Sequence, residues 1–260
     1  MAEFIECNGH TIHYKYLDNK SVKNILFINS LGSDFRIWDA VLPSINAHGN
    51  ILLYDKRGHG LSDSCPATIG LEDYASDALQ LLQRLSISQC TVVGISVGGM
   101  IAQILASQYP GMVGKAVLCD TAQIIGNQEM WNARIAKIKA EGLRSISSDL
   151  MKRWFSPSFH ASYPERVAGY KNMLERSDLE GYVQTCEAIR DTDTTEIAKK
   201  LKMPVLCIVG EGDLSTSPAE MRSLTELIPG AKLEIISGSG HIPCIDNHEK
   251  FARTVIEFIK

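Results

Sequence analysis

The chain has 260 residues, of which 45% are hydrophobic and 22% are charged, a composition typical of one globular domain or one domain with an insertion. The net charge of −4 and the absence of any block of lysine and arginine disfavour nucleic-acid binding. The apolar runs are too short to cross a bilayer, and the N-terminus lacks the pattern of a secretory signal.

In chain order, the first elements are two strand-like segments joined by Asn8 and Gly9, and Asn-Gly between such segments signals a hairpin. Continuous apolar runs of the kind seen in buried parallel strands follow, with turn residues behind each. These runs span 24–29, 50–55, 91–95, 115–120, 204–209 and 232–236, and helical patterns lie between them at 35–45, 71–85, 97–108 and 251–259. We therefore predict an α/β fold with a mostly parallel central sheet and an N-terminal antiparallel hairpin.

One region interrupts this alternation. From about residue 123 to about residue 202 there is no strand pattern, only helix-like segments such as 130–140 and 178–189. Because strands resume on both sides, we predict a helical cap (lid) at 123–202 inserted into a core domain made of 1–122 and 203–260.

The segment Gly94-Ile95-Ser96-Val97-Gly98 matches the pattern G-x-S-x-G and falls between a strand pattern and a helix pattern. In that setting the serine occupies a sharp, strained turn that raises its hydroxyl above the carboxyl edge of the sheet. The neighbouring positions must then be very small, which explains Gly94 and Gly98. The short pattern also arises by chance in glycine-rich turns, so the predicted nucleophile Ser96 depends on its context and partners.

A serine hydroxyl needs a base to become a good nucleophile, and the base needs a third group to orient it. With this motif the expected chain order is serine, acid, histidine. Asp213 and His241 each lie just beyond an apolar strand pattern, where open α/β sheets place their sites. We predict a catalytic triad of Ser96, Asp213 and His241, with Asp120 as the alternative acid because it also ends a strand.

A tetrahedral intermediate also needs hydrogen-bond donors for its oxyanion. We expect one from the backbone N–H of Val97 and the other from that of Leu31, in the loop after the strand pattern at 24–29. The segment YDKRGHGLSD at 54–63 is expected to form a tight loop beneath the site. We expect a structural role there for His59.

Along its whole length the chain resembles the α/β-hydrolase superfamily. The segments NSLGSDFRIWD, YDKRGHGLSD and GISVGGMIAQ and the cap segments VLCDTAQIIGNQEMWNARI, MKRWFSPSF and GYVQTCEAIRDTD resemble the 3-oxoadipate enol-lactone hydrolases of the β-ketoadipate pathway of aromatic-compound breakdown. The chain departs from that family at Val97, where methionine is usual. The resemblance implies an α/β-hydrolase fold and a serine esterase that opens 3-oxoadipate enol-lactone to 3-oxoadipate through an acyl-enzyme on Ser96, without a cofactor.

The resemblance also implies a substrate with a free carboxylate, which an arginine binds best through two hydrogen bonds. Arg134 is the first choice because it lies three residues after Trp131 on an expected cap helix, so the two share a face. Arg153, beside Trp154, is the second choice. Both tryptophans are expected to line the pocket or to pack the cap. The alternative for Arg134 and Arg153 is that each is a solvated surface residue with no role in binding.

Other functions stay open at this stage. The same scaffold serves carboxylesterases and lactonases of other specificity and C–C bond hydrolases, and a non-catalytic small-molecule receptor is the alternative from another class. The expected partner is a small carboxylate-bearing lactone or ester, with no nucleic acid and no membrane, for a monomer or small homo-oligomer. The seven cysteines include no CxxC pair, so we expect no disulfide scaffold, no metal site and a cytoplasmic location.

Overall fold

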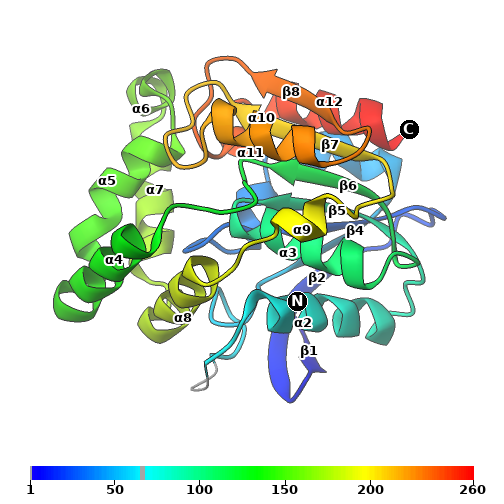
Figure 1. Ribbon diagram of the computed structural model, residues 1–260, viewed down its shortest axis with the longest axis horizontal. Coiled ribbons are helices and arrows are strands. Elements are labelled where there is room, and N and C mark those ends of the chain that lie inside the picture. Colours follow the sequence, from blue (N-terminus) through cyan, green and yellow to red (C-terminus); the bar gives the residue numbers. More distant parts are fainter. Residues whose placement is uncertain (1, 65–67) are drawn as a thin grey trace.

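The computed structural model describes residues 2–64 and 68–260, which form an 8-stranded sheet in the order β1-β2-β4-β3-β5-β6-β7-β8 (Figure 1). The strands are β1 Glu3–Cys7, β2 His10–Leu17, β3 Asn24–Ile28, β4 Asn50–Tyr54, β5 Cys90–Ile95, β6 Val113–Cys119, β7 Val205–Gly210 and β8 Lys232–Ile236. The six strands β4-β3-β5-β6-β7-β8, in sheet order, pair in parallel with their neighbours. In contrast, β2 pairs antiparallel with both β1 and β4. The predicted α/β class with an N-terminal antiparallel hairpin is confirmed.

The turn between β1 and β2 shows why the hairpin signal worked. Asn8 and Gly9 have φ angles of 51° and 78°. Two consecutive positive φ values are what a two-residue hairpin turn of the favoured hand requires, and Asn-Gly is the sequence that tolerates them best.

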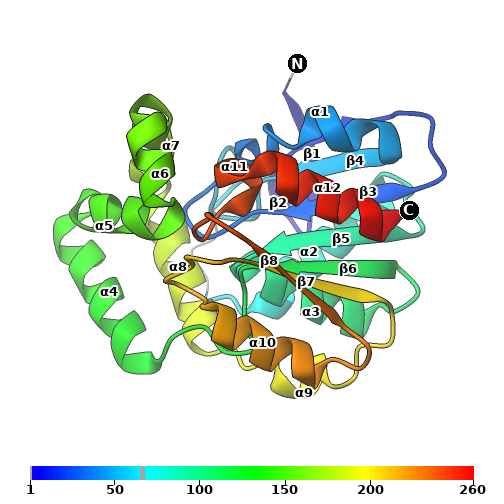
Figure 2. The ribbon, with the colours of Figure 1, turned by 90° about the horizontal axis from the view of Figure 1, so that it is seen from above.

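Helices cover both faces of the sheet. In Figure 2, α12 (His248–Ile259) and α1 (Leu42–Ile45) lie over one face, with α2 (Leu71–Arg84) and α3 (Val97–Gln108) behind the other. The further helices outside α4–α8 are α9 Thr195–Ala198, α10 Pro218–Leu227 and α11 Pro243–Asp246, and the 3₁₀ turns are η1 Phe35–Trp38 and η2 Asn46–His48.

The single helical pattern predicted over 35–45 is wrong in detail, because the structure divides it into η1 and α1. Pro43 lies in the first turn of α1. Proline has no N–H to donate and fits best at the start of a helix, so it begins a new helix instead of continuing the earlier turn.

Between β6 and β7 the described chain contains helices and no strand. Besides α9, the helices there are α4 Gln128–Glu141, α5 Arg144–Trp154, α6 Pro157–Ser162, α7 Pro164–Glu175 and α8 Leu179–Arg190, and we call these five helices the cap. Figures 1 and 2 show the cap beyond the ends of the strands toward which the arrows point, so it faces the carboxyl edge of the sheet. The division at 123 and 202 stays a prediction.

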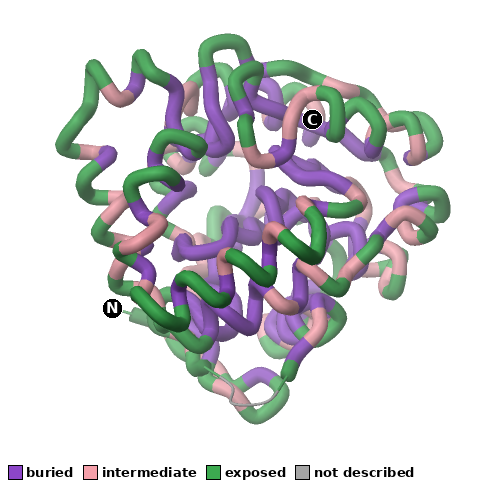
Figure 3. The backbone as a smooth tube through the Cα atoms, turned by 60° about the vertical axis from the view of Figure 1, so that its left-hand side comes forward, coloured by how far each residue is buried: buried purple, intermediate pink, exposed green. Residues whose placement is uncertain are grey.

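The buried residues gather in the central strands and in the helix faces that touch them, while the outer turns of the cap are exposed (Figure 3). Six of the cysteines are free and buried, and Cys65 lies outside the described residues. None of the described helices is both long and apolar enough to span a membrane.

Candidate active site

Ser96 lies at the junction of β5 and α3, with φ 59° and ψ −123°. A residue with a side chain in such a conformation carries strain of about 1–3 kcal/mol, which proteins keep mainly at functional sites. The two glycines of the motif make the turn possible. A Cβ atom on Gly94 would lie 2.1 Å from the carbonyl oxygen of Gly98, and one on Gly98 would lie 2.3 Å from that of Ile28. The close packing of strand, turn and helix therefore requires glycine at both positions.

His241 and Asp213 form a buried pair, although they follow different strands, β8 and β7. The Nδ1 atom of His241 lies 2.8 Å from Oδ2 of Asp213, and the two side chains are 4% and 0% exposed. Asp213 also accepts hydrogen bonds from the N–H of Ser215 and from the hydroxyl of Thr216, each at 2.7 Å. The carboxylate is thus held rigidly against the imidazole.

The electrostatics of this pair suit an acid that orients a base. Burial by itself raises the pKa of Asp213, but the charge of His241 and the hydrogen bonds from His241, Ser215 and Thr216 outweigh it, so the pKa lies below its usual value. An ionised Asp213 accepts the Nδ1–H of the imidazole, which leaves Nε2 as the basic nitrogen. Ser96 and His241 line one small cavity of about 50 Å³ beneath the cap.

Asp120, the alternative acid, also lies near this pair but in a different state. It is fully buried after β6, with φ 44°, and its Oδ1 accepts the N–H of Gly210 at 2.8 Å. Burial, and then the charge of Asp213, raise the pKa of Asp120 well above its usual value. A neutral carboxylic acid stabilises an imidazolium poorly, so the geometry favours Asp213 as the partner of His241.

The spacing of Asp120, Asp213 and His241 could also suit a metal ion, because one ligand atom from each lies within 4.8 Å of the others. However, Oδ2 of Asp213 already accepts hydrogen bonds from His241 and Thr216. A cation would have to displace both. The donor set therefore favours a hydrogen-bonded acid and imidazole over a metal centre.

The expected oxyanion loop is a tight turn directly after β3. The N–H and hydroxyl of Ser33 donate to the carbonyl of Ser30 at 3.4 and 2.9 Å, and Gly32 has a φ of 69°. Ser30 and Leu31 line the same cavity as Ser96. The N–H of Leu31 has no acceptor among the described residues, so it is available to a ligand. Val97 is the first residue of α3, so its N–H has no partner within the helix.

His59 lies beneath this turn, where its Nε2 accepts the N–H of Gly32 at 3.1 Å and its Nδ1 lies 3.2 Å from the carbonyl of Arg57. This arrangement requires a neutral ring with the proton on Nδ1. Burial, assisted by the charge of Lys56, lowers the pKa of His59 well below its usual value. His59 therefore supports the loop and does not face the cavity.

The residues expected to bind substrate also line the cavity of Ser96. They are Arg134, Trp131, Arg153 and Trp154. The guanidinium of Arg134 lies 4.8 Å from the centre of the Trp131 ring, whose Nε1 donates to the carbonyl of Ile125 at 2.6 Å. Arg153 donates to the carbonyl of Leu214 at 2.9 Å. Both arginines are therefore near the nucleophile, although each already has a contact within the protein.

Sequence reasoning missed Asp246, which joins the cap to the loop of His241. Its Oδ2 accepts the N–H groups of Gly240 and Ser156 at 2.7 and 2.8 Å, and its Oδ1 accepts the Ser156 hydroxyl at 2.8 Å. The N–H of His241 donates to the carbonyl of Arg153 at 3.2 Å. The only signal in the sequence is an acidic residue five positions after the histidine.

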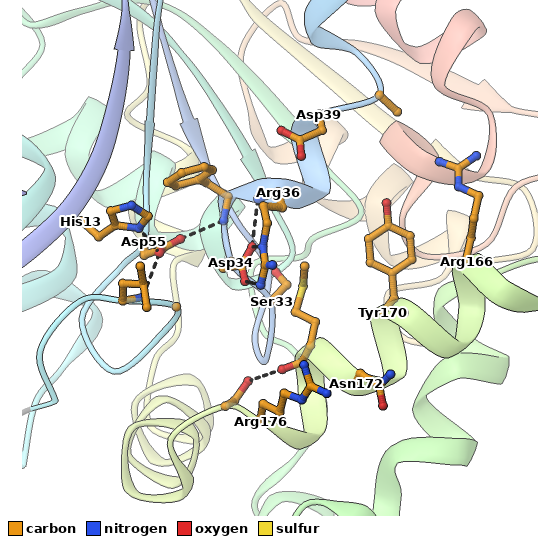
Figure 4. Close-up of a pocket in the computed structure, with 17 residues that line it drawn as sticks. His13, Ser33, Asp34, Arg36, Asp39, Asp55, Arg166, Tyr170, Asn172 and Arg176 are labelled. Carbon is orange, nitrogen blue, oxygen red and sulfur yellow. Dashed lines mark hydrogen bonds and ion pairs between the residues drawn. The ribbon is translucent and has the colours of Figure 1, made fainter. Parts of the chain in front are cut away.

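A larger cavity of about 820 Å³ lies between α7 and the segment that follows the oxyanion loop (Figure 4). Figure 4 shows Arg166, Tyr170 and Asn172 of α7 on one side of it, with Arg36 beside Asp34 on the other. None of Ser96, Asp213 and His241 lines this cavity. Size alone therefore does not locate the reacting groups.

Residues 23–248 match a family model described as alpha/beta hydrolase fold. The 3-oxoadipate enol-lactonase 2 of Acinetobacter baylyi is 31% identical over 91% of this chain and 88% of that protein, and the 3-oxoadipate enol-lactonase 1 of the same organism is 28% identical. The crystal structure of the enol-lactonase from Burkholderia xenovorans LB400 has a TM-score of 0.96 at 31% identity and covers 99% of both chains. These matches confirm both resemblances.

Proposed function

The chain belongs to the alpha/beta hydrolase fold family, and we propose that it is a serine hydrolase that opens 3-oxoadipate enol-lactone to 3-oxoadipate in the β-ketoadipate pathway. The observation that carries the proposal is the arrangement of the small cavity. A strained serine and the imidazole of a buried His241–Asp213 pair line it together with two arginines. The names of the enol-lactonase relatives support the choice of substrate.

In the proposed first step, the Ser96 hydroxyl attacks the lactone carbonyl while Nε2 of His241 takes its proton. The N–H groups of Leu31 and Val97 donate to the oxyanion that forms. The ring C–O bond then breaks, and His241 returns the proton to the departing enol oxygen. An enol is a better leaving group than an alkoxide, and the released arm becomes a ketone by tautomerisation while it stays attached through the acyl ester.

In the second step, His241 removes a proton from water, which attacks the acyl ester of Ser96. Collapse of the second tetrahedral intermediate expels the serine oxygen, which regains its proton from His241 and leaves 3-oxoadipate. Water is the only co-reactant that these steps need. We place the reaction in the cytoplasm, in keeping with the buried free thiols.

The substrate carboxylate is assigned to Arg134, with Arg153 as the second candidate, and Trp131 and Trp154 form the apolar walls. The cavity of about 50 Å³ is far smaller than the roughly 300–1,000 Å³ typical of ligand sites. Substrate entry therefore requires cap side chains to move, and we assign this movement to Arg134 and Arg153, which line the cavity.

The test is a kinetic comparison of 3-oxoadipate enol-lactone with neutral esters such as p-nitrophenyl acetate. The proposal expects a kcat/KM for the lactone well above that for the ester, and loss of both activities in Ser96→Ala. A ratio near one favours a carboxylesterase of broad specificity. No turnover of either compound by a folded protein favours a small-molecule receptor.

A further inference from the structure

Lys56 is a fully buried lysine, 0% exposed, in the loop beneath the oxyanion turn. Lysine is almost never fully buried unless it is paired, because its ammonium loses its hydration. Among the described residues its Nζ has one hydrogen-bond acceptor, the carbonyl oxygen of Ser30, at 2.6 Å. Burial lowers the pKa of Lys56 well below its usual value, against the opposing charges of Asp55 and Asp34. So costly a placement requires a reason.

The carbonyl that Lys56 contacts belongs to the peptide unit that joins Ser30 to Leu31. The N–H of that same unit is the Leu31 N–H that we assign to the oxyanion hole. Three donors meet on this oxygen, namely Nζ of Lys56 and the N–H and hydroxyl of Ser33. The peptide plane is therefore held by three hydrogen bonds to its carbonyl oxygen.

We propose that Lys56 is a positioning residue that orients and polarises the Ser30–Leu31 peptide, so that its N–H stabilises the oxyanion of the transition state. The inference rests on the proposed function, because it needs an oxyanion at Ser96. A hydrogen bond donated to a peptide oxygen strengthens the N–H of the same peptide as a donor. Lys56 acts through this peptide and does not line the cavity.

The size of the effect follows from that of the donor it supports. Removing a whole oxyanion donor lowers kcat by about 100- to 1000-fold. Lys56→Met leaves the Leu31 N–H in the protein but removes the group that holds and polarises its peptide, so we expect kcat to fall by about tenfold. KM is expected to stay within twofold, because the interaction strengthens only as the oxyanion forms.

The chain offers a matched control in Lys115 of β6. Its Nζ donates to the carbonyl of Phe258 at 2.8 Å, which is also a lysine-to-carbonyl hydrogen bond but is remote from the cavity. Lys115→Met therefore removes the same kind of contact without touching the oxyanion turn. Its kcat is expected within twofold of the unchanged protein.

The experiment measures kcat, KM and melting temperature for Lys56→Met, Lys56→Gln and Lys115→Met, with p-nitrophenyl acetate. It adds the inhibition constant of phenylboronic acid, whose tetrahedral adduct on Ser96 mimics the oxyanion. We expect Lys56→Met to weaken boronate inhibition by about the same tenfold as kcat. Lys56→Gln, which keeps an N–H donor without a charge, is expected to recover part of both losses.

A role in folding alone would lower the melting temperature of Lys56→Met but leave kcat and boronate inhibition within twofold. That result overturns the inference. Failure of the proposed function gives a different result from failure of this inference. In that case the unchanged protein itself shows no turnover that depends on Ser96. If Lys56→Met does not fold, Lys56→Gln alone tests the inference. A loss of at least threefold in kcat and in boronate affinity supports it, and unchanged values contradict it.

Discussion

The Nδ1 atom of His241 lies 2.8 Å from Oδ2 of Asp213, although the two residues are 28 positions apart and belong to different loops. They meet because β7 and β8 are neighbours that run in parallel, so the loops after both strands reach the same edge of the sheet. The strained turn of Ser96 reaches that edge from β5. Sheet topology thus brings the three groups to one place.

Asp213→Asn tests the role of the acid. Asparagine favours the tautomer with the proton on Nε2, which cannot take the serine proton, so we expect kcat to fall by about 10⁴-fold with little change in fold. Initial rates and a melting curve measure both effects. Asp120→Asn is the matched control and should stay within tenfold, and a larger loss in Asp120→Asn than in Asp213→Asn would reverse the assignment.

Arg134→Ala tests the carboxylate clamp. Charge-assisted hydrogen bonds of this kind contribute about 1.5–3 kcal/mol, so kcat/KM for the carboxylate-bearing lactone should fall by about 10- to 100-fold. Hydrolysis of p-nitrophenyl acetate, which has no carboxylate, should change by less than threefold. Arg153→Ala, measured in parallel, identifies the clamp if it shows the selective loss instead. Equal losses on both substrates in Arg134→Ala contradict the clamp at that residue.

Asp246→Asn tests the link between the cap and the loop of His241. The new NH₂ group would face the N–H or hydroxyl donors of Ser156 and Gly240, so we expect a lower melting temperature and a roughly tenfold lower kcat. Asp149→Asn on α5 is the control, because its carboxylate is exposed and pairs with the exposed Lys152. Unchanged kcat in Asp246→Asn would show that the contact does not position the histidine.

Gly98→Ala tests the packing of the nucleophile turn. The added Cβ would lie 2.3 Å from a backbone oxygen, which the structure can relieve only by moving strand or helix. We expect a loss of about 3 kcal/mol or more in the free energy of unfolding, measured by urea denaturation. Gly111→Ala, where a Cβ would meet nothing within 4 Å, should change it by about 0.5 kcal/mol at most. Equal stability of the two variants would contradict the packing argument.

His59 predicts a pH dependence of stability. Its pKa is lowered in the folded state, first by burial and then by the charge of Lys56. Below about pH 6.5 the imidazole of His59 binds a proton in the unfolded chain but stays neutral in the folded chain. The stability that the neutral ring contributes above that pH is therefore lost as the pH falls. The free energy of unfolding should decrease by up to about 1.4 kcal/mol per pH unit from this group. His59→Gln should flatten the slope between pH 7 and pH 5, and an unchanged slope contradicts the assignment.

The fold could be predicted because its strands carry the signal themselves. All five residues of β4 are buried, and four of them, at 51–54, form an uninterrupted apolar run. The glycines around Ser96 are required by close backbone contacts. The helix pattern at 35–45 was misleading because apolar spacing does not register the break before Pro43. The backbone restriction of Pro43, and not the apolar spacing, determines where this helix begins.

The contacts that support the site could not be predicted in the same way. Lys56 looks like a surface residue in the sequence, and only the packing of two distant loops shows that it is buried against Ser30. Asp246 reads as a helix-end aspartate until the cap is placed over it. Such roles depend on partners that are dozens of residues away, and periodicity reports nothing about them.

Ser96 as the nucleophile is the central assignment, and mass spectrometry of the intact protein and of its peptides after treatment with a fluorophosphonate tests it directly. We predict one adduct per chain, located on the peptide that contains Ser96, with none in Ser96→Ala and slow labelling in His241→Ala. Labelling at another residue, or equal labelling of Ser96→Ala, would contradict it.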